Sequence, residues 1–276
     1  MKNNRICFLG CGNMGRSLIG GILANGYRAE LLCGADPDPR QRDNIKQRFG
    51  IEVYQNNRDA INGADVVVLA IKPQVMQATL SAVAEMLIKQ DPLIISIAAG
   101  IRLSSIGKWL QKELSVVRVM PNTPALIQAG AAALFANRQV SSAQSELAET
   151  ILRSVGTAVW VDDEGLMDTV TALSGSGPAY FFLLMEVLEK AAVELGLPQQ
   201  KARLLTMETA FGAAKMVMES GQDAATLRQQ VTSPGGTTEQ ALKVLTQGGL
   251  EELFRDALQA AHRRSVQLAD SLGDET

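Results

Sequence analysis

A run of glycines near the N-terminus has the spacing that suits phosphate binding. Gly10-Cys11-Gly12-Asn13-Met14-Gly15 reads G-x-G-x-x-G, follows the apolar segment 5–10 and opens the helix-spaced segment 14–25. Between a strand and a helix, the first glycine permits a tight turn, the second lets the backbone approach a pyrophosphate, and the third lets the helix pack closely. Amides and the dipole at a helix N-terminus favour negative charge. The spacing therefore predicts a dinucleotide-binding loop, with contacts from Gly10, Gly12, Asn13, Met14 and Gly15.

An acidic residue follows this loop at the distance that a ribose contact requires. Asp36 lies about 20 residues after Gly15, at the end of a second strand predicted over 30–35. A carboxylate there can accept a hydrogen bond from the ribose 2′-hydroxyl of NAD. Two alternatives stay open: Asp36 only begins the turn 36–39, and the basic residues beyond it either meet the 2′-phosphate of NADP or form a solvated helix face. Those residues are Arg40, Arg42 and Lys46. NADPH and NADH are both expected as cofactors.

Small or polar residues also follow three later strands. Ligands of open parallel sheets bind at the carboxyl ends of the strands, and small residues there leave room for a nicotinamide ring. Lys72 could touch a ribose or phosphate, or could be an ordinary surface lysine. The predicted cofactor contacts at these ends are Ala70, Ile71, Lys72, Pro73, Ala98, Ala99, Gly100 and Asn122.

Two glycine-rich loops in the second half of the chain precede helices. Residues 174–178 (SGSGP) lead into an apolar helix, and residues 232–238 (TSPGGTT) lead into another. Flexible amides at a helix N-terminus form an anion site, although either loop alone is also compatible with an ordinary connection. Thr237 and Gln240 fit a capping box, which leaves the Thr238 hydroxyl available. The predicted substrate contacts are Ser176, Ser233, Gly235, Gly236, Thr237 and Thr238.

The elements that must position these residues alternate in the first half of the chain. Unbroken apolar runs without alternation are typical of parallel strands buried on both faces, and helical segments lie between them. Strands are predicted over 5–10, 30–35, 65–71, 93–98, 115–120, 131–135 and 157–161. Helices are predicted over 14–25, 39–49, 74–89, 103–112 and 141–155. This order predicts an α/β fold with a doubly wound parallel sheet.

The second half carries no strand pattern. Long helices are predicted over 178–195, 198–220, 237–247 and 250–272, so we expect a dinucleotide-binding domain at 1–162 and an all-helical domain at 163–276. The helix from Pro178 begins Ala-Tyr-Phe-Phe-Leu-Leu-Met, which is apolar on every side. A small helical domain can scarcely bury such a helix alone. We therefore expect a second subunit to cover it, with burial against the first domain as the alternative.

Composition excludes several functions. The chain has 276 residues, 46% hydrophobic and 20% charged, with a net charge of -3, which describes a folded protein with no basic run for nucleic acid. No apolar segment approaches the ~20 residues of a membrane span, and the N-terminus lacks a signal-peptide pattern. Three cysteines, Cys7, Cys11 and Cys33, are best interpreted as reduced thiols. A cytoplasmic protein without nucleic-acid or membrane partners is expected.

Hydrolytic and metal chemistry are also poorly supported. The one histidine, His262, stands beside Arg263 and Arg264 in a predicted solvated helix face. No G-x-S-x-G follows a strand, so a Ser-His-Asp hydrolase is nearly excluded. No residue set has the spacing of a metal site.

Together these segments resemble the pyrroline-5-carboxylate reductase family over almost the whole chain. The resemblance rests on Gly10–Gly15, Ala70–Pro73 (AIKP), Ser96–Gly100 (SIAAG) and Met120–Pro124 (MPNTP). Its most specific parts are Leu173–Tyr180 (LSGSGPAY) and Val231–Thr238 (VTSPGGTT). It implies a Rossmann domain, a helical domain that interlocks with a partner's, an active site built from two subunits, and dimers or rings of dimers. It also implies a cofactor contact from Asn56.

The resemblance implies that NAD(P)H reduces L-1-pyrroline-5-carboxylate to L-proline. Such a site must hold a small carboxylate and hydrogen-bond the imine nitrogen, while the cofactor supplies the hydride. The amides of 233–238 can hold the carboxylate, and the Thr238 hydroxyl can contact the nitrogen, so Thr238 is the expected catalytic residue. Two alternatives remain. One is a β-hydroxyacid dehydrogenase that uses Lys190 or Lys215, and the other is a nucleotide-binding scaffold without turnover.

Overall fold

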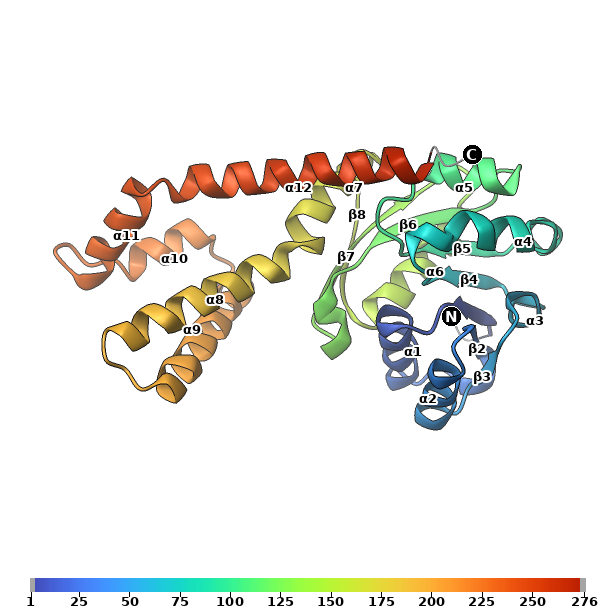
Figure 1. The fold of residues 1–276 in the computed structure, drawn as a ribbon, viewed down its shortest axis with the longest axis horizontal. Coiled ribbons are helices and arrows are strands. Elements are labelled where there is room, and N and C mark those ends of the chain that lie inside the picture. The colour runs from blue at the N-terminus through green and yellow to red at the C-terminus, as the bar shows by residue number, and fades with distance from the viewer. Residues whose placement is uncertain (1–2, 274–276) are drawn as a thin grey trace. The chain divides into compact units, whose positions relative to one another are not determined.

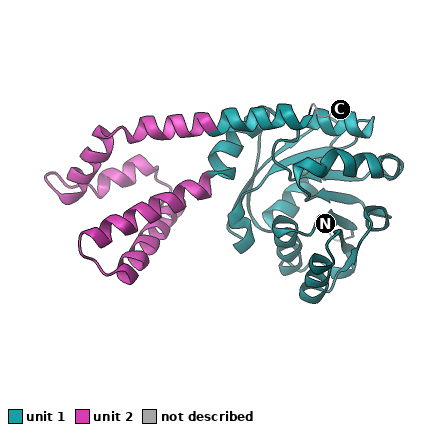
Figure 2. Cartoon of the chain, in the orientation of Figure 1, with its two compact units in different colours: residues 1–176, 261–276 teal, residues 177–260 magenta. Residues whose placement is uncertain are grey.

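The computed structural model describes residues 3–273, and these divide into two compact units (Figure 2). Of the described residues, 3–176 and 261–273 belong to unit 1, and 177–260 belong to unit 2. No helix in the described part of the chain has the length and apolar character that a membrane crossing needs.

Unit 1 is built on an eight-stranded sheet with the order β3-β2-β1-β4-β5-β6-β7-β8. The strand order reverses between β1 and β4, as in doubly wound folds, so the predicted α/β fold class is confirmed. The strands are β1 (Ile6–Leu9), β2 (Leu32–Ala35), β3 (Glu52–Tyr54), β4 (Val66–Leu69), β5 (Leu93–Ser96), β6 (Val116–Met120), β7 (Gly130–Ala136) and β8 (Gly156–Trp160).

The prediction of a parallel sheet is wrong for one strand pair. β6 and β7 pair antiparallel, whereas β7 and β8 pair parallel to each other. The chain between β6 and β7 contains only the short turn η3 (Thr123–Ile127). A parallel neighbour needs a crossover of a dozen or more residues, so this short connection forces the chain to reverse.

Helices cover both faces of the sheet (Figure 1). Buried side chains of α1 (Asn13–Ala24), α2 (Pro39–Phe49) and α6 (Ser142–Arg153) share one core with the sheet. Those of α3 (Asn57–Ile61), α4 (Met76–Gln90) and α5 (Leu103–Leu110) share the other. The central strands are buried on both sides, which explains their unbroken apolar sequences. The sequence pattern missed β3 and α3 because both are very short.

Local signals determine where several of these helices begin. Asp38 caps α2 by accepting the Arg40 N–H at 2.9 Å, and Pro39 follows at the first helical position. Ser141 and Gln144 form a reciprocal capping box at α6. The second predicted strand begins later than expected, because Ala29–Leu31 forms the short turn η1.

Unit 1 continues past β8. α7 (Leu166–Val170) and the π-helical turn η4 (Thr171–Gly175) belong to it, as does the end of α12 (Leu250–Gly273). The Ser265 hydroxyl in α12 donates to the buried Asp168 carboxylate at 2.6 Å, and Arg102 pairs with Asp270 at 2.7 Å. These contacts explain why the compact unit extends to residue 176, and the division at 162 stays a prediction about domains.

Every regular element described in unit 2 is a helix, and loops connect the helices. α8 (Gly177–Glu194), α9 (Gln199–Ser220), α11 (Thr237–Gln247) and α12 agree with the predicted segments within two residues, whereas α10 (Ala224–Gln230) was not predicted. Large apolar side chains stay exposed on these helices, including Phe181 at 63%, Phe211 at 66% and Met218 at 82%. An exposed apolar surface of this kind is typical of a protein interface.

Candidate functional site

The glycine-rich loop lies where the strand order reverses. Gly10 follows β1 with φ +97°, and a Cβ on it would lie 2.4 Å from the Ala70 carbonyl oxygen. A Cβ on Gly15 would lie 2.4 Å from the Gly10 carbonyl oxygen, whereas a Cβ on Gly12 would meet nothing within 4 Å. Gly10 and Gly15 are therefore required by internal packing, and Gly12 faces open space.

The N-terminus of α1 suits a pyrophosphate. Gly12 is its N-cap, and no side chain caps the helix. The first amides of a helix have no intrahelical acceptor, so they remain suited to an anion. The Asn13 carboxamide oxygen accepts from Arg16 at 3.0 Å, and Met14 packs against the core. The cofactor contacts of both residues stay predictions.

Cys11 points away from the loop opening. Its side chain is fully buried, and its Sγ lies 2.8 Å from the position that a Cβ on Gly34 would occupy. Burial, with the Asp36 carboxylate nearby, raises the pKa of the Cys11 thiol to about 12. A thiol in this environment stays protonated and packs as a small apolar side chain.

Asp36 organises the loop in addition to starting a turn. Its two carboxylate oxygens accept the N–H groups of Cys11 and Asp38, each at 2.9 Å, and the residue is 9% exposed. Arg42 donates to the carbonyls of Asp36 and Pro37 at 2.9 Å, so a guanidinium lies beside the same turn. The expected turn is therefore present. The ribose contact stays a prediction.

The other cofactor candidates lie in different surroundings. Ala70 contacts the Gly10 position directly, and Lys72 is exposed at the start of the short turn η2 (Pro73–Val75). The Asn56 side chain caps α3 by accepting the Arg58 N–H at 2.9 Å. Gly100 has φ +73° and is covered by α12, because a Cβ on it would lie 3.3 Å from Leu272 Cδ1. Of 98–100, only Ala99 is exposed.

The oxygen and the nitrogen of the Asn122 carboxamide both form hydrogen bonds with other residues of the chain. Its Oδ1 accepts the Ala131 N–H at 2.9 Å, and its Nδ2 donates to the Ser174 carbonyl at 3.3 Å and to the Ser174 hydroxyl at 3.4 Å. The structure thus brings Asn122 and the first glycine-rich turn of the helical half together. No local sequence pattern indicated this contact, because the two segments are far apart in the chain.

The loop before α11 differs from its prediction in one detail. Thr237 is the first helical residue and Gly236 is the N-cap, with no side-chain cap, so the capping box of Thr237 with Gln240 is wrong. The Glu239 carboxylate instead accepts the Gly235 N–H at 2.8 Å. Gly235 itself has φ +71°, a left-handed conformation that glycine adopts readily. The Thr237 and Thr238 amides have no intrahelical acceptor, since they lie in the first turn.

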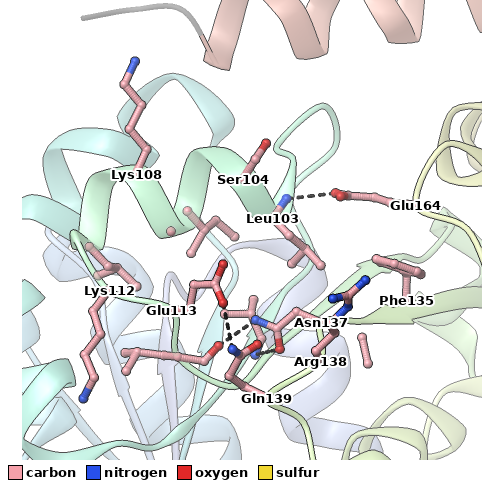
Figure 3. A pocket seen from close by; sticks show the side chains of 16 residues that line it. Leu103, Ser104, Lys108, Lys112, Glu113, Phe135, Asn137, Arg138, Gln139 and Glu164 are labelled. Atoms are coloured by element: carbon pink, nitrogen blue, oxygen red, sulfur yellow. Dashed lines mark hydrogen bonds between the residues drawn. The ribbon is translucent and has the colours of Figure 1, made fainter.

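A hollow of about 580 Å³ lies away from these residues (Figure 3). It is lined by α5, by the amino end of β6 and by the end of β7, which is the sheet edge opposite the glycine-rich loop. The Lys108 and Lys112 amino groups point out of it, and Glu113 is engaged by Gln139 at 2.7 Å. The hollow brings together no predicted site residue.

The described residues contain no cluster of His, Cys, Asp or Glu that could hold a metal ion. They do contain a buried charge pair that the sequence pattern missed. Arg118 on β6 donates to Glu164 at 2.9 Å, and Glu164 also accepts the Leu103 N–H at 2.8 Å. The sequence feature that could have indicated this pair was Arg118, a charged residue within an otherwise apolar strand.

Two family models match the chain. One, described as pyrroline-5-carboxylate reductase dimerisation, covers residues 164–268. The other, described as NADP oxidoreductase coenzyme F420-dependent, covers residues 5–100.

Relatives match the chain along its length. A pyrroline-5-carboxylate reductase of Pseudomonas aeruginosa is 50% identical and covers 99% of this chain and 100% of its own. One of Pasteurella multocida is 39% identical, covering 97% and 98%. The solved pyrroline-5-carboxylate reductase of Coxiella burnetii has 46% identity and a TM-score of 0.93, covering 96% and 98%. A Plasmodium falciparum pyrroline carboxylate reductase solved with NADP bound has 30% identity and a TM-score of 0.86, covering 98% and 99%.

Proposed function

The chain belongs to the pyrroline-5-carboxylate reductase family. On this basis we propose which of its residues bind the cofactor and the substrate and which residue takes part in catalysis. It is an NAD(P)H-dependent oxidoreductase that acts on an imine, and its reaction converts L-1-pyrroline-5-carboxylate to L-proline, the last step of proline biosynthesis. The chain also self-associates through its helical region, as the matched dimerisation segment implies. This agrees with the expectation that a second subunit covers the apolar helix from Pro178.

The cofactor is proposed to bind at the reversal of strand order. The observation that carries this proposal is the fit of the glycine-rich loop: Gly12 faces open space at an uncapped helix N-terminus, beside the carboxyl ends of β1 and β4. The nicotinamide cofactor supplies the hydride. The backbone amides of residues 12–15 hold the pyrophosphate. Asp36, which accepts the N–H groups of Cys11 and Asp38, lies beside the proposed position of the ribose 2′-oxygen. Lys72 follows β4 and Asn56 follows β3 at the carboxyl edge of the sheet, and both are proposed outer contacts.

The substrate is proposed to bind to the loop before α11. The Thr237 and Thr238 amides hold the carboxylate, with help from Ser233, Gly235 and Gly236. Glu239 accepts the Gly235 N–H, so a bound carboxylate must use the other amides or displace Glu239. The Thr238 hydroxyl donates to the imine nitrogen, which favours hydride transfer to the adjacent carbon. Ser176 is the proposed contact from the first loop.

The lysine-dependent alternative receives little support. A hydroxyacid dehydrogenase would need Lys190 or Lys215 beside the reacting carbon. Lys190 pairs with Glu186 at 2.6 Å and Lys215 with Glu219 at 3.8 Å, each one turn away on an exposed helix face. Both lysines therefore behave as surface residues.

Finer points of assembly and location remain proposals. We propose that a dimer is the smallest active form and that dimers can assemble further into rings. A cytoplasmic location is supported by the three free thiols, all of them buried.

One assay tests the proposed function and the role of Thr238. The purified protein is mixed with L-1-pyrroline-5-carboxylate and NADPH or NADH, and nicotinamide absorbance and proline are both measured. Thr238→Ala should lose ~10²–10⁴-fold in kcat, the usual contribution of a positioned proton donor. Thr238→Ser, which keeps the hydroxyl, is the matched control and should retain most of the rate. Equal loss in both variants would remove the hydroxyl from the mechanism.

A further inference from the structure

The Asn122 carboxamide joins three segments of unit 1. It follows β6, accepts the N–H of Ala131 in β7, and donates to the carbonyl and hydroxyl of Ser174. Ser174 lies in the π-helical turn η4, which ends at Gly175, the residue before Ser176. Since Oδ1 is engaged by β7 and Nδ2 by η4, the protein itself fixes the orientation of the Asn122 carboxamide.

The turn that Asn122 holds is unusual. The Ser176 N–H donates to the Thr171 carbonyl at 2.9 Å, five residues back, which is the wide hydrogen bond of a π-helix. Such turns are rare and occur frequently at functional sites. A second contact pins the same turn: a Cβ on Gly175 would lie 2.3 Å from Met120 Cε. Asn122 and Met120 therefore hold η4 against the carboxyl end of β6 by a polar and an apolar contact.

We propose that Asn122 is a positioning residue that sets the backbone of Ser174–Ser176, rather than a ligand of the cofactor. The inference rests on the proposed function, because it takes Ser176 as a contact of the substrate. Losing the contact would let the wide turn relax toward ordinary helical bonding, which moves Ser176 relative to the sheet edge. A misplacement of about 1 Å in a positioning group can cost on the order of 10²-fold in rate.

The test is Asn122→Asp, which keeps an oxygen for the Ala131 N–H and replaces the donor toward Ser174 by an acceptor. Asn137→Asp is a matched control, because Asn137 also bridges two segments. It donates to the Leu114 carbonyl at 2.7 Å and accepts the Val116 N–H at 3.2 Å, at the opposite sheet edge. Both variants are measured for thermal unfolding, cofactor Kd by nicotinamide fluorescence, and kcat and KM for L-1-pyrroline-5-carboxylate.

Asn122→Asp should lose roughly 10–100-fold in kcat/KM for the imine while the cofactor Kd changes less than twofold. Asn137→Asp should lose stability with unchanged kinetics. A tenfold weaker cofactor Kd in Asn122→Asp would make Asn122 a cofactor ligand and overturn the proposal. Unchanged kinetics, or equal kinetic losses in both variants, would also overturn it.

Gly175→Ala provides a second variant should Asn122→Asp fail to fold. Its added methyl group would lie 2.3 Å from Met120 Cε, so it disturbs the same turn without removing a hydrogen-bonding group, and the same criteria apply. A wild-type protein that reduces no imine with either nucleotide would overturn the proposed function. An active wild type with kinetically silent turn variants would overturn this inference alone.

Discussion

The buried charge pair of Arg118 and Glu164 gives a sharp prediction about stability. The Arg118 side chain is 4% exposed, whereas the Glu164 side chain is 25% exposed. Removing either partner breaks the same 2.9 Å contact but leaves a different residue behind. Glu164→Ala leaves a buried guanidinium without its carboxylate, and Arg118→Met leaves a carboxylate that water and the Leu103 N–H still reach.

The two losses should therefore be unequal. Leaving an uncompensated buried charge costs about 3–5 kcal/mol in the free energy of unfolding. Arg118→Met should cost roughly 1–2 kcal/mol, at the low end for hydrogen bonds to charged groups, because water reaches Glu164. A difference of about 2 kcal/mol corresponds to ~4–8 °C in Tm for a chain of this size.

The assay is urea unfolding of both single variants and the double variant at one protein concentration, because self-association contributes to stability. The double variant should be more stable than Glu164→Ala alone, since it contains no unpaired buried charge. Glu164→Gln, which keeps one carbonyl oxygen able to accept from Arg118 and Leu103 but loses the charge, should lie between the wild type and Glu164→Ala. A double variant less stable than both single variants would refute the reasoning.

Three further outcomes are expected. Asp36→Asn removes negative charge beside the proposed 2′-position, so the ratio of NADPH to NADH kcat/KM should rise several-fold; an unchanged ratio would contradict a role for Asp36 in nucleotide choice. Gly15→Ala forces a methyl group to 2.4 Å from the Gly10 carbonyl oxygen, so both cofactor affinity and the urea midpoint should fall, whereas Gly12→Ala, whose methyl group meets no protein atom within 4 Å but enters the space proposed for the pyrophosphate, should weaken cofactor Kd by at least tenfold with an unchanged urea midpoint; an unchanged Kd in Gly12→Ala would contradict the proposed pyrophosphate position. Burial raises the pKa of the Cys11 thiol to about 12, whereas the unfolded thiol ionises near pH ~8.5. The unfolded state then binds fewer protons, so this thiol's contribution to stability is present below about pH 8.5 and is lost as pH rises toward 12. Urea midpoints at increasing pH should fall less in Cys11→Ala than in the wild type, and parallel curves would exclude the thiol as the cause.

The sequence by itself determined the fold class and most element positions. The glycine loop, the apolar runs of β4 and β5 and the helix at Thr237 are specified by local chemistry, since turn geometry, burial on two faces and helical spacing each leave a pattern in adjacent residues. The family, and with it the reaction, followed from the same local segments.

Local patterns were insufficient wherever a residue's role depends on a distant segment. No local pattern indicated that the Asn122 carboxamide binds Ser174 or that Gly100 is covered by α12, and the cofactor contacts of both residues stay predictions. The spacing of Thr237 and Gln240 suggested a capping box, but the structure instead has a hydrogen bond from the Gly235 N–H to the Glu239 carboxylate.

Only the tertiary structure decided these partnerships, and it also decided that β7 runs antiparallel and that Arg118 meets Glu164. Local preference depends on a few neighbouring residues, whereas a hydrogen bond across about fifty positions depends on how strands and helices stack around the core. The residues that could do chemistry were therefore visible in the sequence. Which of their polar groups remain available for a ligand was settled by the contacts of the folded chain.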